Sequence, residues 1–193
     1  MYSLDDGKIL INLAKESIKT HFSEKEPNIT EDIKQKYSDK RGVFVTLNKD
    51  GQLRGCIGFT EPIYILYEAI LKAAKSAAFQ DPRFPPVQQD EIDSLSIEIS
   101  ILTPPQLIKV RKSEDYLKEI KIGKDGLIIK TGLSSGLLLP QVASEYDWDV
   151  EKLLRHTCMK ANLSYEAWKD LKHEIYKFQA QIFSEEDGVV VEK

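Results

Sequence analysis

The chain carries one cysteine between two glycines, in the run Arg54-Gly55-Cys56-Ile57-Gly58. Glycine weakens a strand, so two glycines here indicate a bulge, a positive φ or close approach of a ligand to the backbone. Arg54 lies two residues from Cys56, hence on the same face of a regular strand, where its guanidinium would favour the reactive thiolate. The run predicts a nucleophilic or redox thiol, or an anion site made by Arg54 and free N–H groups. A small buried thiol in a tightly packed strand would give the same pattern.

Two further features could contribute to such a site. The proline-rich run Asp81-Pro82-Arg83-Phe84-Pro85-Pro86 is a stiff loop that presents an acid and an arginine at low entropic cost. It either forms the wall of a site or simply ends a helix, with Phe84 sealing the core. Glu98 lies on the polar face of a predicted strand. If that face lines a cleft, Glu98 would orient a ligand or act as a base. If that face is open to solvent, Glu98 would have no such role.

The second cysteine, Cys158, is predicted to be structural. It shares one helical stripe with four other residues, Val150, Leu153, Leu154 and Thr157. His156 lies off that stripe and does not face Cys158. The spacing of the cysteines and histidines fits no zinc site, and the sequence contains no phosphate loop, dinucleotide fingerprint or Gly-x-Ser-x-Gly elbow.

Helices and strands must position these residues. In the first half, hydrophobic periodicity predicts amphipathic helices, a hairpin and one alternating strand. These elements are a helix from Ser3 to Ile18, a short helix near Thr30 to Tyr37, hairpin strands 43–47 and 52–58, a helix from Glu61-Pro62 to about Phe79, and a strand 94–102.

The second half repeats this order. It has strands at 127–130 and 137–139, a helical region opened by Pro140, a helix at 149–160, a short one at Trp168 and an alternating strand from Tyr176 to Ile182. We therefore predict one α+β domain, 1–193, of antiparallel sheets with helices, with an internal duplication of a hairpin–helix–strand unit over about 42–102 and 126–183. Chance similarity of short α+β units is the alternative.

Composition narrows the functional class. With 41% apolar and 30% charged residues, the 193-residue chain is too apolar for a disordered protein. Its net charge of −4 argues against general binding of nucleic acid or anionic membranes. The chain has two cysteines, which predicts free thiols in a reducing compartment, the cytoplasm. It has no apolar run of about 20 residues, so we expect no membrane span.

These segments together resemble the AMMECR domain family, named for the Alport syndrome, mental retardation, midface hypoplasia and elliptocytosis chromosomal region. The resemblance rests on runs 53–58 and 78–85, with further matches at 95–103, 136–142, Trp168 and 178–183. It implies an α+β fold in two unequal subdomains and a context shared with Memo-like and radical-SAM proteins. It also implies Arg54, Gly55, Cys56 and Gly58 as candidate site residues, and names no cofactor.

The leading hypothesis is a small-ligand or protein-modifying site centred on Cys56, with Arg54 as the anion anchor and Arg83 and Glu98 as additional walls. The two arginines would favour an anionic small molecule or an acidic segment of a protein partner. The rival is a non-catalytic adaptor or regulatory module in which Cys56 is core and the glycines serve only the backbone.

The duplication also predicts where the site lies. We expect the polar strand faces of the two units, with Glu98 in one and Gln179 or Gln181 in the other, near a shared boundary. The Cys56 strand and the loop 81–86 should both approach that junction, because ligand pockets form where packed units leave a concavity.

Overall fold

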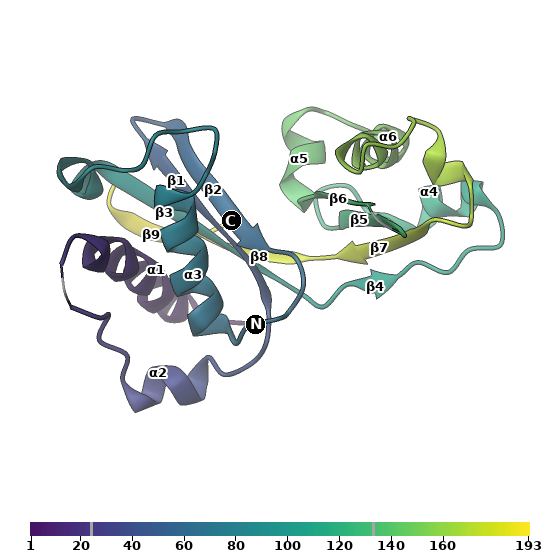
Figure 1. Ribbon diagram of the computed structural model, residues 1–193. Coiled ribbons are helices and arrows are strands. Elements are labelled where there is room, and N and C mark those ends of the chain that lie inside the picture. The colour runs from purple at the N-terminus through teal and green to yellow at the C-terminus, as the bar shows by residue number, and fades with distance from the viewer. Residues whose placement is uncertain (24, 133) are drawn as a thin grey trace. The chain divides into compact units, whose positions relative to one another are not determined.

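The computed structural model describes residues 1–23, 25–132 and 134–193, and it confirms an α+β fold with two antiparallel sheets. The chain divides into two compact units. The first unit contains Met1–Leu102 together with Gln181–Lys193, and the second contains Thr103–Ala180. Both are drawn in Figure 1. Among the described residues, no helix has both the length and the apolar character that a membrane span requires.

The first unit is a five-stranded sheet with helices packed on one face. The strands, in order across the sheet, are β2 (Gln52–Phe59), β1 (Gly42–Lys49), β3 (Leu95–Leu102), β8 (Ala180–Glu186, whose first residue belongs to the second unit) and β9 (Val189–Glu192). The helices are α1 (Leu4–Lys19), α2 (Glu31–Lys36) and α3 (Leu66–Phe79), with 3-10 turns η1 (Thr20–Phe22) and η2 (Gln89–Ser94).

Small side chains let α3 lie close to its neighbours. Ala69, Ala73 and Ala77 recur every four residues and are buried, as their spacing predicts for close approach of another element. The Oγ of Ser17 on α1 donates to the backbone carbonyl of Leu71 on α3 at 2.9 Å. The inward strand residues complete this core.

One β-bulge interrupts the hairpin. The register pairs Leu47 with Gly55 and then Asn48 with Leu53, so Arg54 is the extra residue of β2. A bulge of this kind shifts the alternation of side chains between the two faces. Arg54 and Cys56 therefore need not lie on the same face of the sheet, although regular strand geometry predicts that they do.

The second unit is a four-stranded sheet with its own core. Its strands, in order, are β4 (Gln106–Leu107), β7 (Glu174–Phe178), β5 (Gly126–Thr131) and β6 (Ser134–Leu138). Its helices are α4 (Tyr116–Glu119), α5 (Pro140–Glu145) and α6 (Val150–Lys160), with 3-10 turns η3 (Ser113–Asp115) and η4 (Ala167–Lys169). Cys158 and Trp168 are buried among the residues of this core, as predicted for Cys158.

The two halves share a strand topology. In each, the strand after the helical region pairs with the first strand of the hairpin, which gives the orders β2-β1-β3 and β6-β5-β7. The element order predicted from the sequence is present, whereas the internal duplication stays a prediction.

The predicted start of the helix after the hairpin was wrong. The helix predicted from Glu61-Pro62 begins only at Leu66, because Ile65 forms a β-bridge with Lys40 and the Leu66 N–H donates to the Asp39 carbonyl. Those backbone groups are used between segments and cannot start a helix.

The alternating run from Tyr176 to Ile182 is not one strand. It contains the end of β7 and the start of β8, which belong to different sheets. The Gln179 N–H donates to the Thr103 hydroxyl, and the Thr103 N–H donates to the Gln179 carbonyl, both at 2.8 Å. Alternation persists through this crossing because both strands have a period of two.

Candidate functional site

Cys56 lies in the middle of β2, on the sheet face opposite the helices. Thr46 on β1 is the register partner of both Cys56 on β2 and Glu98 on β3, so the three residues form one row across the sheet. The Thr46 hydroxyl donates to the Cys56 Sγ at 3.3 Å. Neighbouring strands are about 4.8 Å apart, which places Glu98 about 10 Å from Cys56 along this row. Cys56 and Glu98 were predicted as site residues from the sequence, whereas Thr46 was not.

A lysine from the C-terminal end of the chain extends the row. The Lys193 Nζ lies 2.9 Å from the Glu98 Oε2, and this pairing raises the pKa of Lys193. The Glu98 side chain is 17% exposed. The carboxylate is thus paired with an ammonium group, which favours a positioning role over that of a free general base.

The stiff loop after α3 binds the backbone of Cys56 directly. The Cys56 N–H donates to the Asp81 Oδ2 at 2.9 Å, and the Arg83 guanidinium donates to the Cys56 carbonyl at 3.3 Å. Since β2 is an edge strand, the loop takes the place of a neighbouring strand and satisfies both backbone groups. The structure therefore brings together Cys56 and Arg83, which are 27 residues apart.

Asp81 and Arg83 form a rigid charged pair. The guanidinium donates from Nε and Nη2 to the two oxygens of Asp81, at 2.9 and 2.7 Å. This bidentate contact, with the N–H groups of Cys56 and Arg83, holds the pKa of the Asp81 carboxyl well below its usual range despite burial. The Asp81 side chain is 2% exposed, whereas that of Arg83 is 54% exposed.

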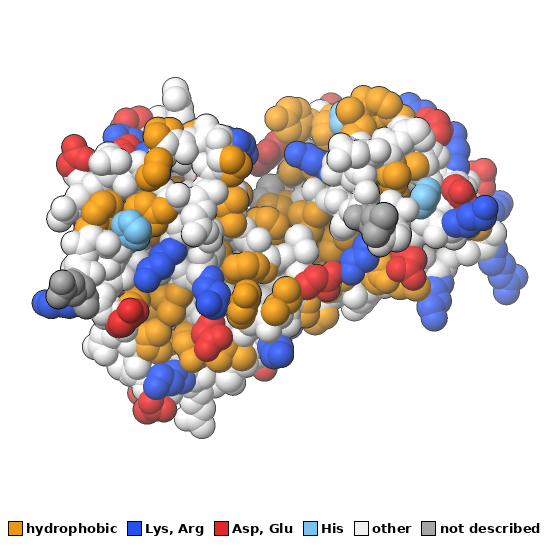
Figure 2. Space-filling model, in the orientation of Figure 1, with side chains coloured by type: hydrophobic (Ala, Val, Ile, Leu, Met, Phe, Trp, Pro, Cys, Tyr) orange, Lys and Arg blue, Asp and Glu red, His pale blue; other side chains and the backbone are white. Residues whose placement is uncertain are grey.

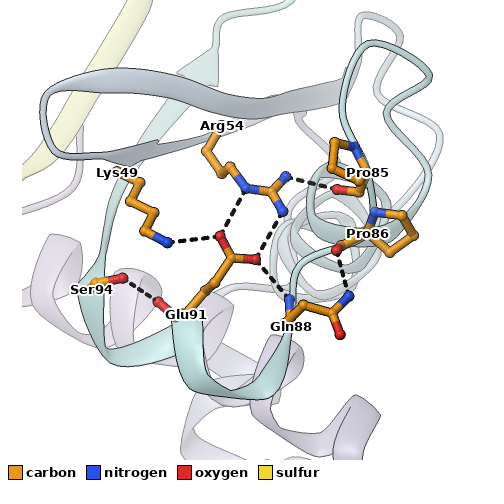
Figure 3. Close-up of polar contacts among 7 residues, drawn as sticks. All are labelled: Lys49, Arg54, Pro85, Pro86, Gln88, Glu91 and Ser94. Carbon is orange, nitrogen blue, oxygen red and sulfur yellow. Dashed lines mark hydrogen bonds and ion pairs between the residues drawn. The ribbon is translucent and has the colours of Figure 1, made fainter.

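Arg54 makes a different set of contacts, drawn in Figure 3. It donates from Nε and Nη2 to the two oxygens of Glu91, at 3.2 and 3.0 Å, and from Nη1 to the Pro85 carbonyl at 2.8 Å. The Lys49 Nζ lies 3.0 Å from the same carboxylate. The guanidinium of Arg54 is therefore paired inside a network, and only 13% of this side chain is exposed.

Glu91 is the acceptor that the sequence analysis missed. Hydrogen bonding by Arg54, by the Gln88 N–H and by Lys49 lowers the pKa of Glu91 to about 2. Gln88 and Glu91, three residues apart, form a capping box at the start of η2. That spacing is the one sequence signal that could have indicated a buried role for Glu91.

The two glycines serve close packing. Neither has a positive φ. A Cβ on Gly55 would lie 2.2 Å from the Ala77 carbonyl oxygen of α3, and a Cβ on Gly58 would lie 2.2 Å from the Val43 carbonyl oxygen. The structure thus corrects the suggestion of a positive φ at Gly55 or Gly58 and shows that both glycines contact protein backbone.

The other residues considered from the sequence lie in different parts of the chain's two units. Both cysteines are free thiols, with Cys56 half-buried and Cys158 fully buried; burial raises the pKa of Cys158 to about 11. Gln179 lies in the second unit and Gln181 in the first, so a site at a shared boundary stays a prediction. The described residues contain no group of three or more potential metal ligands.

Comparison with known proteins places the chain in a family. The AMMECR1 family model matches residues 11–183. A protein of Methanocaldococcus jannaschii is 48% identical, with 100% of this chain and 98% of that protein covered. One of Methanothermobacter thermautotrophicus is 46% identical, with 95% and 96% covered.

A solved structure agrees with this assignment. The crystal structure of an uncharacterized protein from Pyrococcus horikoshii matches with a TM-score of 0.90 and 46% identity, and covers 97% of this chain and 96% of that chain. The similarity extends over nearly the whole of both chains. The chain belongs to the AMMECR1 family.

Proposed function

We propose that the first unit binds an anionic small molecule, or an acidic segment of a protein, at a site centred on the Cys56 thiol. The observation that carries the proposal is the fixation of Cys56 by Asp81 and Arg83, which use both of its backbone polar groups while the thiol stays half-exposed. These contacts fix the backbone of Cys56, and the Thr46 hydroxyl holds its thiol, so a ligand would meet the site at little entropic cost.

The neighbours of the thiol suit an anion. The Arg83 side chain is 54% exposed beside the Cys56 carbonyl. Its Nε and Nη2 are bound to Asp81 and Cys56, so Nη1 is the group that would donate to a carboxylate or phosphate. The Thr46 hydroxyl donates to Sγ and would stabilise a thiolate. In this proposal Arg83 takes the anchoring role that the sequence suggested for Arg54, while Glu98 and its Lys193 partner limit the site on the far side of Thr46.

Thiol reactivity tests the proposal, with Cys158 as the internal reference. We expect a thiol reagent near neutral pH to label Cys56 at least tenfold faster than Cys158, whose thiol is buried and whose pKa is about 11. Thr46→Val, which keeps the shape and removes the hydroxyl, should slow the labelling of Cys56. Phosphate or a dicarboxylate should slow it in the parent protein and not in Arg83→Gln.

The rival adaptor function makes the opposite prediction. If Cys56 only packs, both cysteines label slowly, and Thr46→Val and added anions change nothing. A melting temperature within 2 °C of the parent value, roughly the shift of a small stability change, shows that each variant is folded.

A further inference from the structure

Four aromatic rings form a continuous stack at the surface of the second unit. The Tyr146 and Trp148 ring centroids are 5.2 Å apart with planes at 24°, and those of Trp148 and His156 are 3.9 Å apart with planes at 8°. Tyr165 meets His156 edge-on at 6.0 Å. Figure 2 shows hydrophobic side chains gathered over α6, with a histidine among them. Tyr146 and Tyr165, at the two ends, are 66% and 49% exposed.

Backbone geometry holds the Tyr146 end in place. Asp147, which lies between Tyr146 and Trp148 in the sequence, has a φ of +50°. This is in the left-handed region that non-glycine residues rarely adopt. The Trp148 N–H donates to the Ala143 carbonyl at 2.8 Å, which closes the end of α5. The turn therefore places Tyr146 over Trp148 and leaves the outer face of Tyr146 in solvent.

Acidic residues alternate with these rings, in the run Glu145-Tyr146-Asp147-Trp148-Asp149. All three acids are exposed, and Asp149 caps α6 by accepting the Lys152 N–H at 2.8 Å. Of the ion pairs between described residues, none involves Glu145 or Asp147. The Tyr146 end thus combines an open aromatic face with two uncompensated carboxylates.

The Tyr165 end has similar rings and a different charge balance. The neighbouring Glu166 is bound by Arg155 at 2.8 Å and also by Lys169. Arg155 in turn contacts Glu151 at 2.9 Å. Charge at this end is compensated within the chain, so the two ends form a natural comparison.

We propose that the Tyr146 end of the stack docks an arginine side chain of a basic peptide segment from a partner protein. The face of an aromatic ring carries negative charge density and attracts a cation. A guanidinium can stack flat on Tyr146 and still donate hydrogen bonds in its plane to the carboxylates of Glu145 and Asp147. Nucleobases could also stack, but the acidic flanks repel a phosphate backbone. This surface is in the second unit, and its role does not depend on Cys56.

The test uses the full chain and a synthetic octapeptide with two arginines in a glycine–serine sequence. The indole N–H resonance of Trp148 reports binding, and that of Trp168, which is 2% exposed, is the internal reference. We expect the Trp148 resonance alone to shift. Replacing arginine by neutral citrulline should weaken binding at least fivefold, and replacing it by lysine should weaken it less.

Variants separate the ring from the charge. Tyr146→Ala should weaken peptide binding about fivefold, and Asp147→Asn, which tolerates the left-handed backbone, should weaken it by a similar factor. Tyr165→Ala is the matched control and should leave binding unchanged. Unshifted resonances of the buried core show that each variant is folded.

Three results would overturn the proposal. The first is that the citrulline peptide binds with the same affinity as the arginine peptide. The second is that Tyr165→Ala and Tyr146→Ala lose the same amount of peptide affinity. The third is that a single-stranded oligothymidine binds more tightly than the arginine peptide at the same salt concentration. The last result would assign the stack to bases and not to a cation.

Discussion

At the scale of single residues, the two cysteines lie in contrasting environments. Cys158 is enclosed by the core of the second unit, and burial raises the pKa of its thiol. Cys56 is half-buried on an open sheet face, accepts a hydrogen bond from Thr46 and has its backbone bound by Asp81 and Arg83. The reactivity of a thiol depends on this environment, so our proposal assigns reactivity to Cys56 and not to Cys158.

Arg54 is expected to act on stability and not on thiol reactivity. Its guanidinium is bound to Glu91 and Pro85, so Arg54→Ala leaves a half-buried carboxylate without its main partner. We expect a loss of about 1–3 kcal/mol in the free energy of unfolding, measured by urea denaturation. The labelling rate of Cys56 in the folded variant should stay within twofold of the parent value. A tenfold slower rate would restore Arg54 as the group that activates the thiol.

The Arg54–Glu91 contact should also make stability depend on pH. The folded state holds the pKa of Glu91 at about 2, below the ordinary 4.5. Between these values the unfolded chain binds the proton and the folded chain does not, so this stabilisation is complete above pH 4.5 and is lost as the pH falls to 2.

Glu91→Gln measures this contribution. We expect the variant to be less stable than the parent by about 1 kcal/mol at pH 7, after allowance for screening by solvent, and the difference to shrink as the pH falls below 4.5. Urea midpoints at several pH values give both quantities. Glu31→Gln, in a surface pair whose carboxylate is 87% exposed, is the control and should change little at any pH. If the difference in stability between Glu91→Gln and the parent did not change with pH, the stabilisation would not be due to the lowered pKa of Glu91 in its folded contacts.

At the scale of elements, the site depends on how closely β2 lies against α3. Gly55 faces the backbone of Ala77, and the bulge at Arg54 turns the neighbouring guanidinium toward η2. The helix end then supplies Asp81 and Arg83 to the outer edge of the same strand. One strand thus receives packing on one side and hydrogen bonds along its edge from the same helix–loop segment.

Gly55→Ala tests this close approach. The added Cβ would lie 2.2 Å from a carbonyl oxygen of the α3 backbone, which cannot move aside as a side chain would. We expect a loss of about 1–3 kcal/mol in stability by thermal or urea unfolding, together with a changed labelling rate of Cys56. Gln52→Ala, on an exposed position of the same strand, should be nearly neutral. Full stability of Gly55→Ala would mean that strand and helix separate easily.

At the scale of the whole molecule, the first unit is discontinuous in sequence. The chain leaves it after Leu102 and returns at Gln181, where β8 and β9 complete the sheet. Phe183 on β8 is fully buried, and its ring occupies the space beside Gly7 on α1, where a Cβ would lie 2.3 Å from the ring. Glu185 on the same strand pairs with Lys15 on α1 at 2.9 Å.

Phe183→Ala should therefore destabilise a helix near the opposite end of the chain. Loss of a buried phenylalanine and the resulting cavity cost about 3–5 kcal/mol. We expect faster amide hydrogen exchange in α1 and β3, measured in the full chain. Val189→Ala on β9, where the side chain is 61% exposed, is the control. Unchanged protection of α1 would show that the last strands add little to the first unit.

The sequence by itself determined the local elements and the membership of Cys158 in a core. Helices α1 and α6, the hairpin, and β3 each follow from a periodicity within fewer than twenty residues, which the chain expresses without reference to distant segments. The sequence also singled out Cys56 by its flanking glycines, Arg83 by the prolines around it, and Glu98 by its place on the polar face of an alternating strand.

Tertiary structure alone decided what these residues contact. The bulge changed the parity of β2, so the face of Arg54 could not be derived from counting, and its partner Glu91 lies 37 residues away. The crossing of the chain at Gln179 was hidden because two successive strands share one alternation. The stack of Tyr146 on Trp148 required a left-handed Asp147. The bulge and the crossing depend on pairings between segments, and the stack depends on one left-handed residue, and local periodicity encodes none of these.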